Sequence, residues 1–460
     1  RGYLISLKKN RTRAQMLIQN LQKHRIVAHE LKKAMTVKQI KFKPGEAVIV
    51  PTNQPQTRFL KGIMERVLTF QDSLFYDVSA WTLPLAYGVE YIELKQNPTT
   101  YLGPQLSPLT MDGGSATGGK AASAYLMEWN RYYAPRSLYS MIESGIHPRL
   151  TKQPFSAVVD GKTRQFDRGT IVIPVNQRDA DGDISADEIH KMVQYLAETD
   201  HVNIFAVNSA STPSGPDLGG AGQSVLQKPR VAILSGEGTS SYGVGEAWHL
   251  LNFRMRIPVS LLNAKKLNAQ KLAKYNTIVV ADGSYTNLDS TDIKNLKSWI
   301  SNGGTLIATQ SGSKWAVNKK VLDEKLKKAK KDTLDIPYDH VQNVTGAQRI
   351  GGAIFKITLD NTHPIAFGYG KSAPVFRRGD AFFELSAKTA ANVGRYTNEP
   401  LLSGYISEEK LAGIKGSASI IARRQGRGHV VLFADNPNFR AFWYGTNGLF
   451  LNAVFFGQAF

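Results

Sequence analysis

The chain has 460 residues, no cysteine and a formal net charge of +20. The absence of cysteine excludes disulfides, thiolate metal sites and a cysteine nucleophile. No run of about 18 apolar residues is present, so no transmembrane helix is predicted. The length predicts two to four domains.

The excess of basic residues indicates either attraction to a polyanion or a solvated basic surface. The densest lysine cluster, residues 319–331, has a helical pattern with Leu322, Leu326 and Ala329 on one side. No aromatic residue alternates with these lysines, as single-strand binding would require, so no nucleic-acid partner is expected. The first residue is Arg1 and no signal-peptide pattern precedes the first predicted strand, so we expect further sequence upstream.

Two segments near the start repeat one order of predicted elements. Tyr3 and Tyr125 each open a short strand, which a helical pattern follows. Phe42 and Phe166 each begin a Phe-x-x-Gly turn that leads into an apolar strand ending near a proline. This recurrence predicts an internal duplication of a βαβ-type module.

Residues 97–120 and 209–224 are rich in Gly, Pro, Ser and Thr, which is typical of loops and linkers. They divide the chain into a first module at 1–120, a second at 121–225 and a third domain at 226–460. In the third domain, buried-type strands such as 229–234 and 303–309 alternate with helical patterns. This alternation predicts an α/β fold with a doubly wound parallel sheet, preceded by two related smaller α/β modules.

The predicted turn between the strand at 305–309 and the following helix is the sharpest candidate for chemistry. Nucleophiles occupy such elbows at the carboxyl ends of parallel strands. Ser311 is the candidate nucleophile, and the backbone amides of Gly283, Ser284 and Gly312 are candidate oxyanion donors. A histidine base is also required. The downstream histidines that could supply it are His363 and His429.

Two further loops are candidate ligand sites. Gly236 and Gly238 follow a strand as in a dinucleotide fingerprint, but Ser241 replaces the third glycine, which favours a simple glycine turn. Asp435, Asn436 and Arg440 follow the strand at 430–434. They fit either a ligand site or a loop held by its own side chains.

Metal-binding patterns are weak. Asp179, Asp181, Asp183 and Glu188 match part of a calcium loop. Its first position is Gln177, so we prefer an acidic turn that leads into a helix capped by Ser185 and Glu188. No histidine begins a zinc motif, so no zinc site and no other cofactor is expected within the chain.

Several segments together carry a resemblance to known families. Residues 229–234, 245–248, 275–283 and 303–315 resemble a class I glutamine amidotransferase-like domain. Residues 433–440 and 449–456, with 75–84, resemble the C-terminal half of large bacterial zinc carboxypeptidases.

The resemblance implies a zinc-binding metallocarboxypeptidase domain upstream, with a signal peptide ahead of it, and therefore secretion or a place in the periplasm or cell envelope. Two departures stand out, since Ser311 replaces the elbow cysteine of amidotransferases and Ile365 follows His363-Pro364 where an acid is expected. Glutaminase activity is therefore not expected. Three hypotheses follow: a non-catalytic accessory region that supports its own peptidase domain or binds its peptide, a Ser311-dependent hydrolase or amidase, and an anionic glycan or cell-wall binding module.

Overall fold

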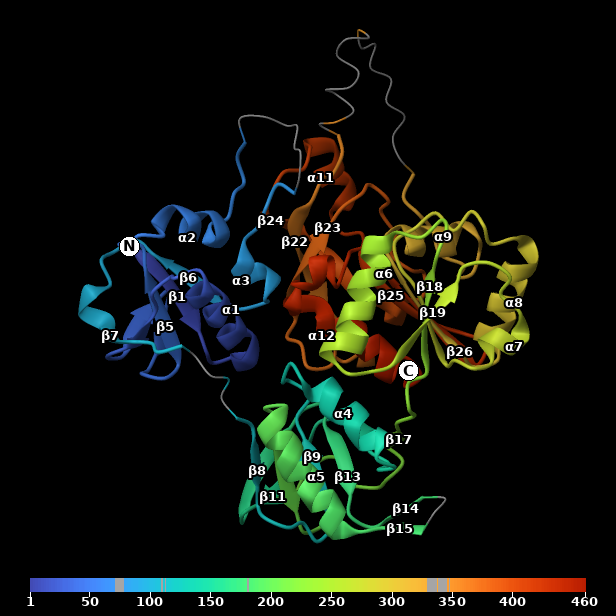
Figure 1. Cartoon of the computed structure of the whole chain (residues 1–460), viewed down its shortest axis with the longest axis horizontal. Helices are drawn as coiled ribbons and strands as arrows, with labels where there is room; N and C mark the ends of the chain where they lie inside the picture. The colour runs from blue at the N-terminus through green and yellow to red at the C-terminus, as the bar shows by residue number, and fades with distance from the viewer. Residues whose placement is uncertain are drawn as a thin grey trace.

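The computed structural model describes residues 1–70, 78–108, 111, 113–179, 182–328, 337, 346 and 348–460, without the side chains of Asp179 and Asp183. Its three largest sheets have five, six and nine strands and follow one another along the chain (Figure 1). Across the described ranges, the helices are too short or too polar to cross a membrane.

The first module is built on a five-stranded antiparallel sheet in the order β6-β1-β5-β2-β7. Helix α1 connects β1 to β2, and both of these strands pair antiparallel with β5. The elements are β1 (Gly2–Ser6), α1 (Arg11–Lys23), β2 (His29–Leu31), β3 (Met35–Val37), β4 (Ile40–Phe42), β5 (Ala47–Pro51), α2 (Thr57–Met64), α3 (Leu83–Ala86), β6 (Tyr91–Leu94), η1 (Thr99–Tyr101) and β7 (Leu102–Gln105).

The second module repeats this plan, with the strand order β17-β10-β13-β9-β16-β8. Helix α4 connects β9 to β10, and both strands pair antiparallel with β13. The elements are β8 (Ser115–Thr117), β9 (Ala124–Met127), α4 (Ala134–Glu143), β10 (Arg149–Thr151), β11 (Phe155–Val159), β12 (Lys162–Phe166), β13 (Ile171–Pro174), β14 (Gln177–Asp179), β15 (Gly182–Ile184), α5 (Ala186–Thr199), β16 (Asn203–Val207) and β17 (Gln223–Val225).

The two modules share one topology. In each, an antiparallel strand separates the two parallel strands that the first helix connects, which is the split βαβ arrangement of ferredoxin-like folds. Tyr3 lies opposite Val50 and Tyr125 opposite Ile173, so the tyrosines hold matching places in register. The sequence analysis predicted a simple βαβ module without this inserted strand. The pattern of apolar residues identifies a strand but does not show which strand it pairs with.

The stretch 97–120, which we predicted to be a linker, is partly sheet. Strand β7 pairs with β2 in the first sheet, whereas β8 pairs in parallel with β16 in the second. Both are edge strands, whose weaker apolar pattern hides them among loop residues. The domain boundaries of the sequence analysis stay a prediction.

The third domain contains a doubly wound, flavodoxin-like sheet, as predicted. Its strands β19, β18, β20, β21 and β26 are parallel and lie in that order. An antiparallel extension, β25-β24-β22-β23, continues from β26. The elements are β18 (Val231–Ser235), α6 (Ser241–Trp248), the π-helical η2 (His249–Arg254), β19 (Val259–Asn263), α7 (Ala269–Leu272), β20 (Thr277–Val280), α8 (Ser290–Ser301), β21 (Thr305–Thr309), α9 (Ser311–Asn318), β22 (Ala353–Leu359), η3 (Pro364–Ala366), β23 (Ser372–Arg377), η4 (Thr389–Ala391), β24 (Asn392–Ser403), α11 (Glu408–Ile414), β25 (Ala418–Gln425), β26 (Gly428–Phe433), η5 (Phe439–Ala441) and α12 (Tyr444–Phe456).

Helices cover both faces of this parallel sheet. Alternate residues of β18 pack into two separate cores, one with α6 and α12 and the other with α8 and α9. Burial on both faces explains why these strands are continuous apolar runs. The described part of the lysine-rich segment, residues 319–328, does not form the predicted helix. Helix α9 ends at Asn318, and turns and loops follow, with an isolated bridge at Leu326.

Helix α12 connects the third domain to both modules. It is buried along nearly its whole length and lies centrally in Figure 1. Trp129 of the second module donates from Nε1 to Asn452 Oδ1 at 2.7 Å, and the Tyr132 hydroxyl donates to Asn447 Oδ1 at 2.8 Å. The first module packs on Trp443, just before the helix, in a third core.

Candidate functional site

The elbow between β21 and α9 is present, but its central residue is Gln310. Gln310 has φ 49° and ψ −121°, a backbone conformation that residues other than glycine rarely adopt. Its amide donates to Phe433 O of the neighbouring strand at 2.9 Å. Ser311 is the first residue of α9, one position beyond the strained turn. The predicted placement of Ser311 at the elbow is therefore wrong by one residue.

The hydroxyl of Ser311 is engaged within the fold. It accepts a hydrogen bond from the Gly283 amide at 2.8 Å and donates one to the Asp282 carboxylate. The Gly283 amide, a predicted oxyanion donor, is thus already bonded to the proposed nucleophile. An oxyanion hole requires donors aimed at the position of the developing charge.

The two candidate histidines lie at the opposite end of the sheet. His429 pairs with Thr305 at the start of β21, whereas Ser311 follows the end of that strand. At about 3.3 Å per residue, this places them more than about 13 Å apart. The His363 and His429 rings flank Phe460, at centroid distances of 4.5 and 4.7 Å. The predicted serine–histidine pairs are not formed.

Both histidines are bonded within the fold. His363 Nδ1 accepts from the Ile365 amide at 3.2 Å, and His429 Nε2 lies 2.6 Å from Phe460 O. Burial lowers the pKa of His363 to about 4 and also lowers the pKa of His429. Both side chains therefore have a structural role in the packing of the fold.

The glycine-rich loops at the carboxyl edge of the sheet do come together. The carbonyl of Gly238 accepts from the amides of Ser284 and Tyr285 at 2.8 and 3.0 Å. Gly236 and Gly238 have φ of 101° and 81°. A Cβ on Gly312 would lie 2.3 Å from the Ala281 carbonyl oxygen. Gly312 is therefore needed for close approach of the backbone, whereas Gly236 and Gly238 are favoured by their positive φ, as in a glycine turn.

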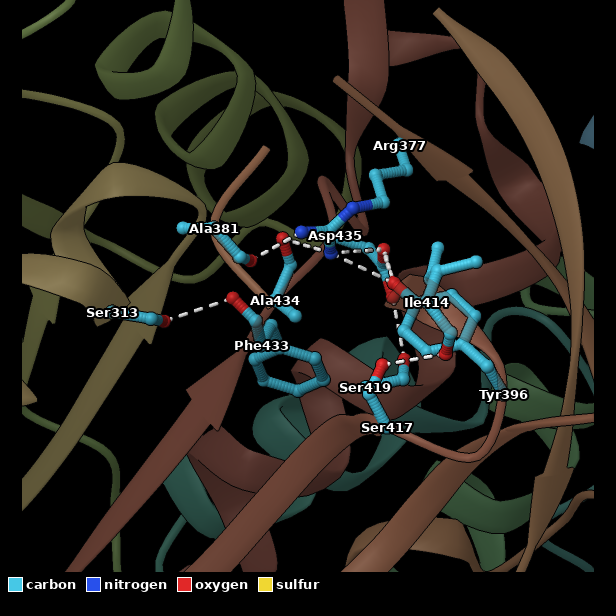
Figure 2. A network of polar contacts seen from close by, with 10 residues as sticks. All are labelled: Ser313, Arg377, Ala381, Tyr396, Ile414, Ser417, Ser419, Phe433, Ala434 and Asp435. Atoms are coloured by element: carbon cyan, nitrogen blue, oxygen red, sulfur yellow. Dashed lines mark hydrogen bonds and ion pairs between the residues drawn. The ribbon is translucent and has the colours of Figure 1, made fainter. Parts of the chain in front are cut away.

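Asp435 is the centre of a buried polar network (Figure 2). Its carboxylate accepts from the Ser419 hydroxyl at 2.5 Å and from the Tyr396 hydroxyl, and it lies 3.4 Å from Arg377 Nη1. Burial raises the pKa of Asp435, while Arg377, Ser419 and Tyr396 hold it down. Asp435 and Arg377 are 4% and 1% exposed, so neither is open to a ligand.

Asn436 and Arg440 are held by Glu246 of α6, which the sequence analysis missed. Asn436 Nδ2 donates to Glu246 Oε2 at 2.7 Å, and the Arg440 amide donates to Oε1 at 2.6 Å. Burial raises the pKa of Glu246. The Arg440 guanidinium lies 5.2 Å from the Trp81 ring centroid. The side chains of this loop are thus engaged within the fold, chiefly by residues of other elements rather than by the loop itself.

Most of the candidate ligand side chains of the predicted calcium loop lie outside the part of the chain that the structure describes. Asp181 lies outside the described residues, as do the side chains of Asp179 and Asp183. The flanking backbone forms the β14–β15 hairpin, and Glu188 is exposed on α5. Ser185 caps α5 by accepting from the Asp187 amide at 3.2 Å. No three His, Asp or Glu side chains within the described ranges gather as a metal site.

The open part of the molecule is elsewhere. A cleft of about 910 Å³ lies where the two modules meet the third domain, and all three contribute to its lining. The first module supplies residues 7–11 and Arg13, the second residues 128–131 and the third residues 368–370, among others. Because these segments are far apart in sequence, no local motif could have indicated the cleft.

Comparisons with known proteins identify no family. No protein-family profile matches the chain, and no curated protein does. Solved structures with similarity include a ThuA-like protein from Bacteroides uniformis ATCC 8492 (13% identity, 49% of this chain, 89% of that chain, TM-score 0.33). PurLQS from Thermotoga maritima (14% identity, 49% and 97%, TM-score 0.33) and beta-galactosidase from Bacillus circulans sp. alkalophilus (14% identity, 48% and 30%, TM-score 0.25) are also similar. Similarity at this level carries no information on activity.

Proposed function

We propose that residues 1–460 form a non-catalytic accessory region that contributes binding rather than chemistry. Following the sequence resemblance, we further propose that it accompanies an exported zinc carboxypeptidase. The observation that supports the non-catalytic role is the elbow, where Gln310 carries an amide in place of a nucleophile. Zinc of such a parent enzyme would be held by residues upstream of this region.

The rival hypothesis is a Ser311-dependent hydrolase or amidase. It requires a base within hydrogen-bond reach of the hydroxyl, about 2.6–3.2 Å. The Ser311 hydroxyl donates to the Asp282 carboxylate and accepts from the Gly283 amide, so it is engaged on both sides within the fold. The histidines proposed as the base lie at the far end of β21. This geometry favours the accessory role.

Catalysis can be tested directly. The protein is incubated with p-nitrophenyl esters, glutamine and a serine-directed fluorophosphonate, alongside Ser311→Ala as the matched control. We expect no turnover or labelling above the control. Turnover that Ser311→Ala abolishes would establish the hydrolase and refute the non-catalytic role.

The carboxypeptidase parent requires a separate experiment. The natural protein is captured with an antibody raised against this region, and its mass, zinc content and release of C-terminal residues from peptides are measured, with and without a chelator. We expect a larger polypeptide that contains zinc and loses activity to the chelator. A natural protein of 50.7 kDa with neither zinc nor peptidase activity would refute this part of the proposal.

A second candidate function, binding of an anionic glycan, is favoured by the lining of the cleft. Six cationic side chains line it against three carboxylates. This candidate is compatible with an accessory role, because accessory regions hold polymeric substrates or anchor an enzyme to them.

A further inference from the structure

The cleft is built from corresponding parts of the duplicated modules. Residues 7–13 follow β1 and residues 128–131 follow β9, the matching strand of the second module. Gly45 and residues 167–170, which precede the matching strands β5 and β13, also line it. Two equivalent loops from each module therefore face one hollow, and residues 368–374 of the third domain close it.

Arg13 is the most unusual residue in this lining. It is 9% exposed, and its Nη1 donates to Gly445 O of α12 at 2.9 Å. The Tyr369 ring centroid lies 5.9 Å from its guanidinium carbon. Within the described part of the chain, no carboxylate pairs with Arg13, and burial lowers its pKa. A buried guanidinium without a counter-ion is destabilising, and a bound anion would relieve that cost.

The second module places further positive charge beside Arg13. Arg131 lines the same adjoining hollow of about 40 Å³ as Arg13, and donates to Asn203 Oδ1 at 3.3 Å. Arg168 is half-buried and lines the main cleft. Two of the three lining carboxylates already have cationic partners, because Glu46 lies 3.4 Å from Lys8 and Glu128 lies 2.7 Å from Arg164. The lining thus has a surplus of positive charge.

The remaining lining groups indicate the rest of the ligand. Side-chain amides and hydroxyls are frequent, including Asn130, Gln165, Asn361 and Ser372. The aromatic residues of the lining are Trp129 and Tyr369, and Trp129 is 7% exposed with its Nε1 bonded to Asn452. Nucleic-acid bases require open aromatic faces for stacking, whereas amides and hydroxyls suit the hydroxyl groups of sugars.

We propose that this cleft binds an acidic oligosaccharide, with Arg13 and Arg168 pairing with its anionic groups and neighbouring amides with its hydroxyls. The volume lies in the range of about 300–1,000 Å³ that ligand sites occupy. Carboxylate and sulfate groups both accept charge-assisted hydrogen bonds from a guanidinium, so the test includes a carboxylated and a sulfated sugar. The proposal deepens the glycan-binding candidate. Its failure would leave the turnover and zinc experiments unaffected.

The test is calorimetric titration of the full chain with a galacturonic acid hexamer, a sulfated heparin hexasaccharide and neutral maltohexaose. We expect one or both acidic sugars to bind, with affinity that falls as salt is raised, and the neutral sugar not to bind. Arg13→Met should weaken binding about tenfold or more, and Arg168→Gln about fivefold. Lys294→Gln, an exposed lysine on α8 away from the cleft, is the matched control and should leave the affinity unchanged.

Three results would overturn the proposal. One is that neither acidic sugar binds at low salt. Another is binding that Arg168→Gln leaves at the unmodified affinity, which would place the ligand elsewhere on the basic surface. Because Arg168 is half-buried, this variant stays informative even if Arg13→Met does not fold. The third is tighter binding of a single-stranded hexanucleotide with the same sensitivity to both variants, which would assign the cleft to nucleic acid.

Discussion

Replacement of Asp435 by asparagine tests whether the network in Figure 2 stabilises the third domain. The Asp435→Asn substitution keeps the shape of the side chain but removes its charge. Arg377, which is 1% exposed, would then lack its counter-ion, and the new amide donor would face the hydroxyls of Tyr396 and Ser419. Breaking a buried charge pair from one side costs about 3–5 kcal/mol.

The free energy of unfolding is measured by urea titration followed by tryptophan fluorescence. Ser419→Ala is the control, because it removes one hydrogen bond and leaves the ion pair, with an expected loss of about 1 kcal/mol. The double variant Asp435→Asn with Arg377→Met should lose less than the sum of the two single variants, since it leaves no buried charge unpaired. An Asp435→Asn protein within about 1 kcal/mol of the unmodified chain would show that the network is not needed for stability.

Three further predictions concern the sheet edge and the histidines. Gln310→Gly should raise the free energy of unfolding by about 1 kcal/mol, because glycine adopts φ 49° without strain; a decrease in urea unfolding would contradict the strain at the elbow. Gly312→Ala should cost about 3 kcal/mol or more, since its Cβ would clash with the Ala281 carbonyl; Gly245→Ala, with open space around it, should be neutral or stabilising in the same measurement. The unfolded state takes up more protons than the folded state between the ordinary histidine pKa of about 6.5 and the pKa of about 4 of His363. Stability should therefore fall as pH falls through that window, by at most about 3 kcal/mol from this group. The His363→Gln variant should flatten the profile of melting temperature against pH. An unchanged profile would assign the pH dependence to other groups.

Apolar runs and their spacing predicted the third domain well. Strands such as β18, β20 and β21 are buried on both faces, so their sequences are continuously apolar and easily identified. The repeat was predicted from Tyr3, Tyr125 and the two Phe-x-x-Gly turns, and the matching strand orders are those that a duplication would produce. Strand partners, and hence the inserted antiparallel strand, require contacts between distant residues that periodicity does not encode.

The strand-to-helix elbow was predicted in location and missed in detail. The elbow follows β21 as expected, but only the backbone angles show that Gln310 rather than Ser311 occupies it. Glu246 had a weak signal, as a single acid among small and apolar residues of α6, and its role depends on a loop almost 200 residues away. The cleft around Arg13 had no sequence signal, because three domains assemble it.

Helix α12 also determines how the chain can be divided for experiments. The second module packs against the helix itself, and the first module packs against Trp443, just before the helix, and contacts its first turn through Arg13 and Tyr87. Expression of the third domain alone would expose this apolar surface to water and favour self-association. Stable fragments are therefore expected only where the surface of α12 stays covered, and a shortened protein for crystallisation would have to retain both modules.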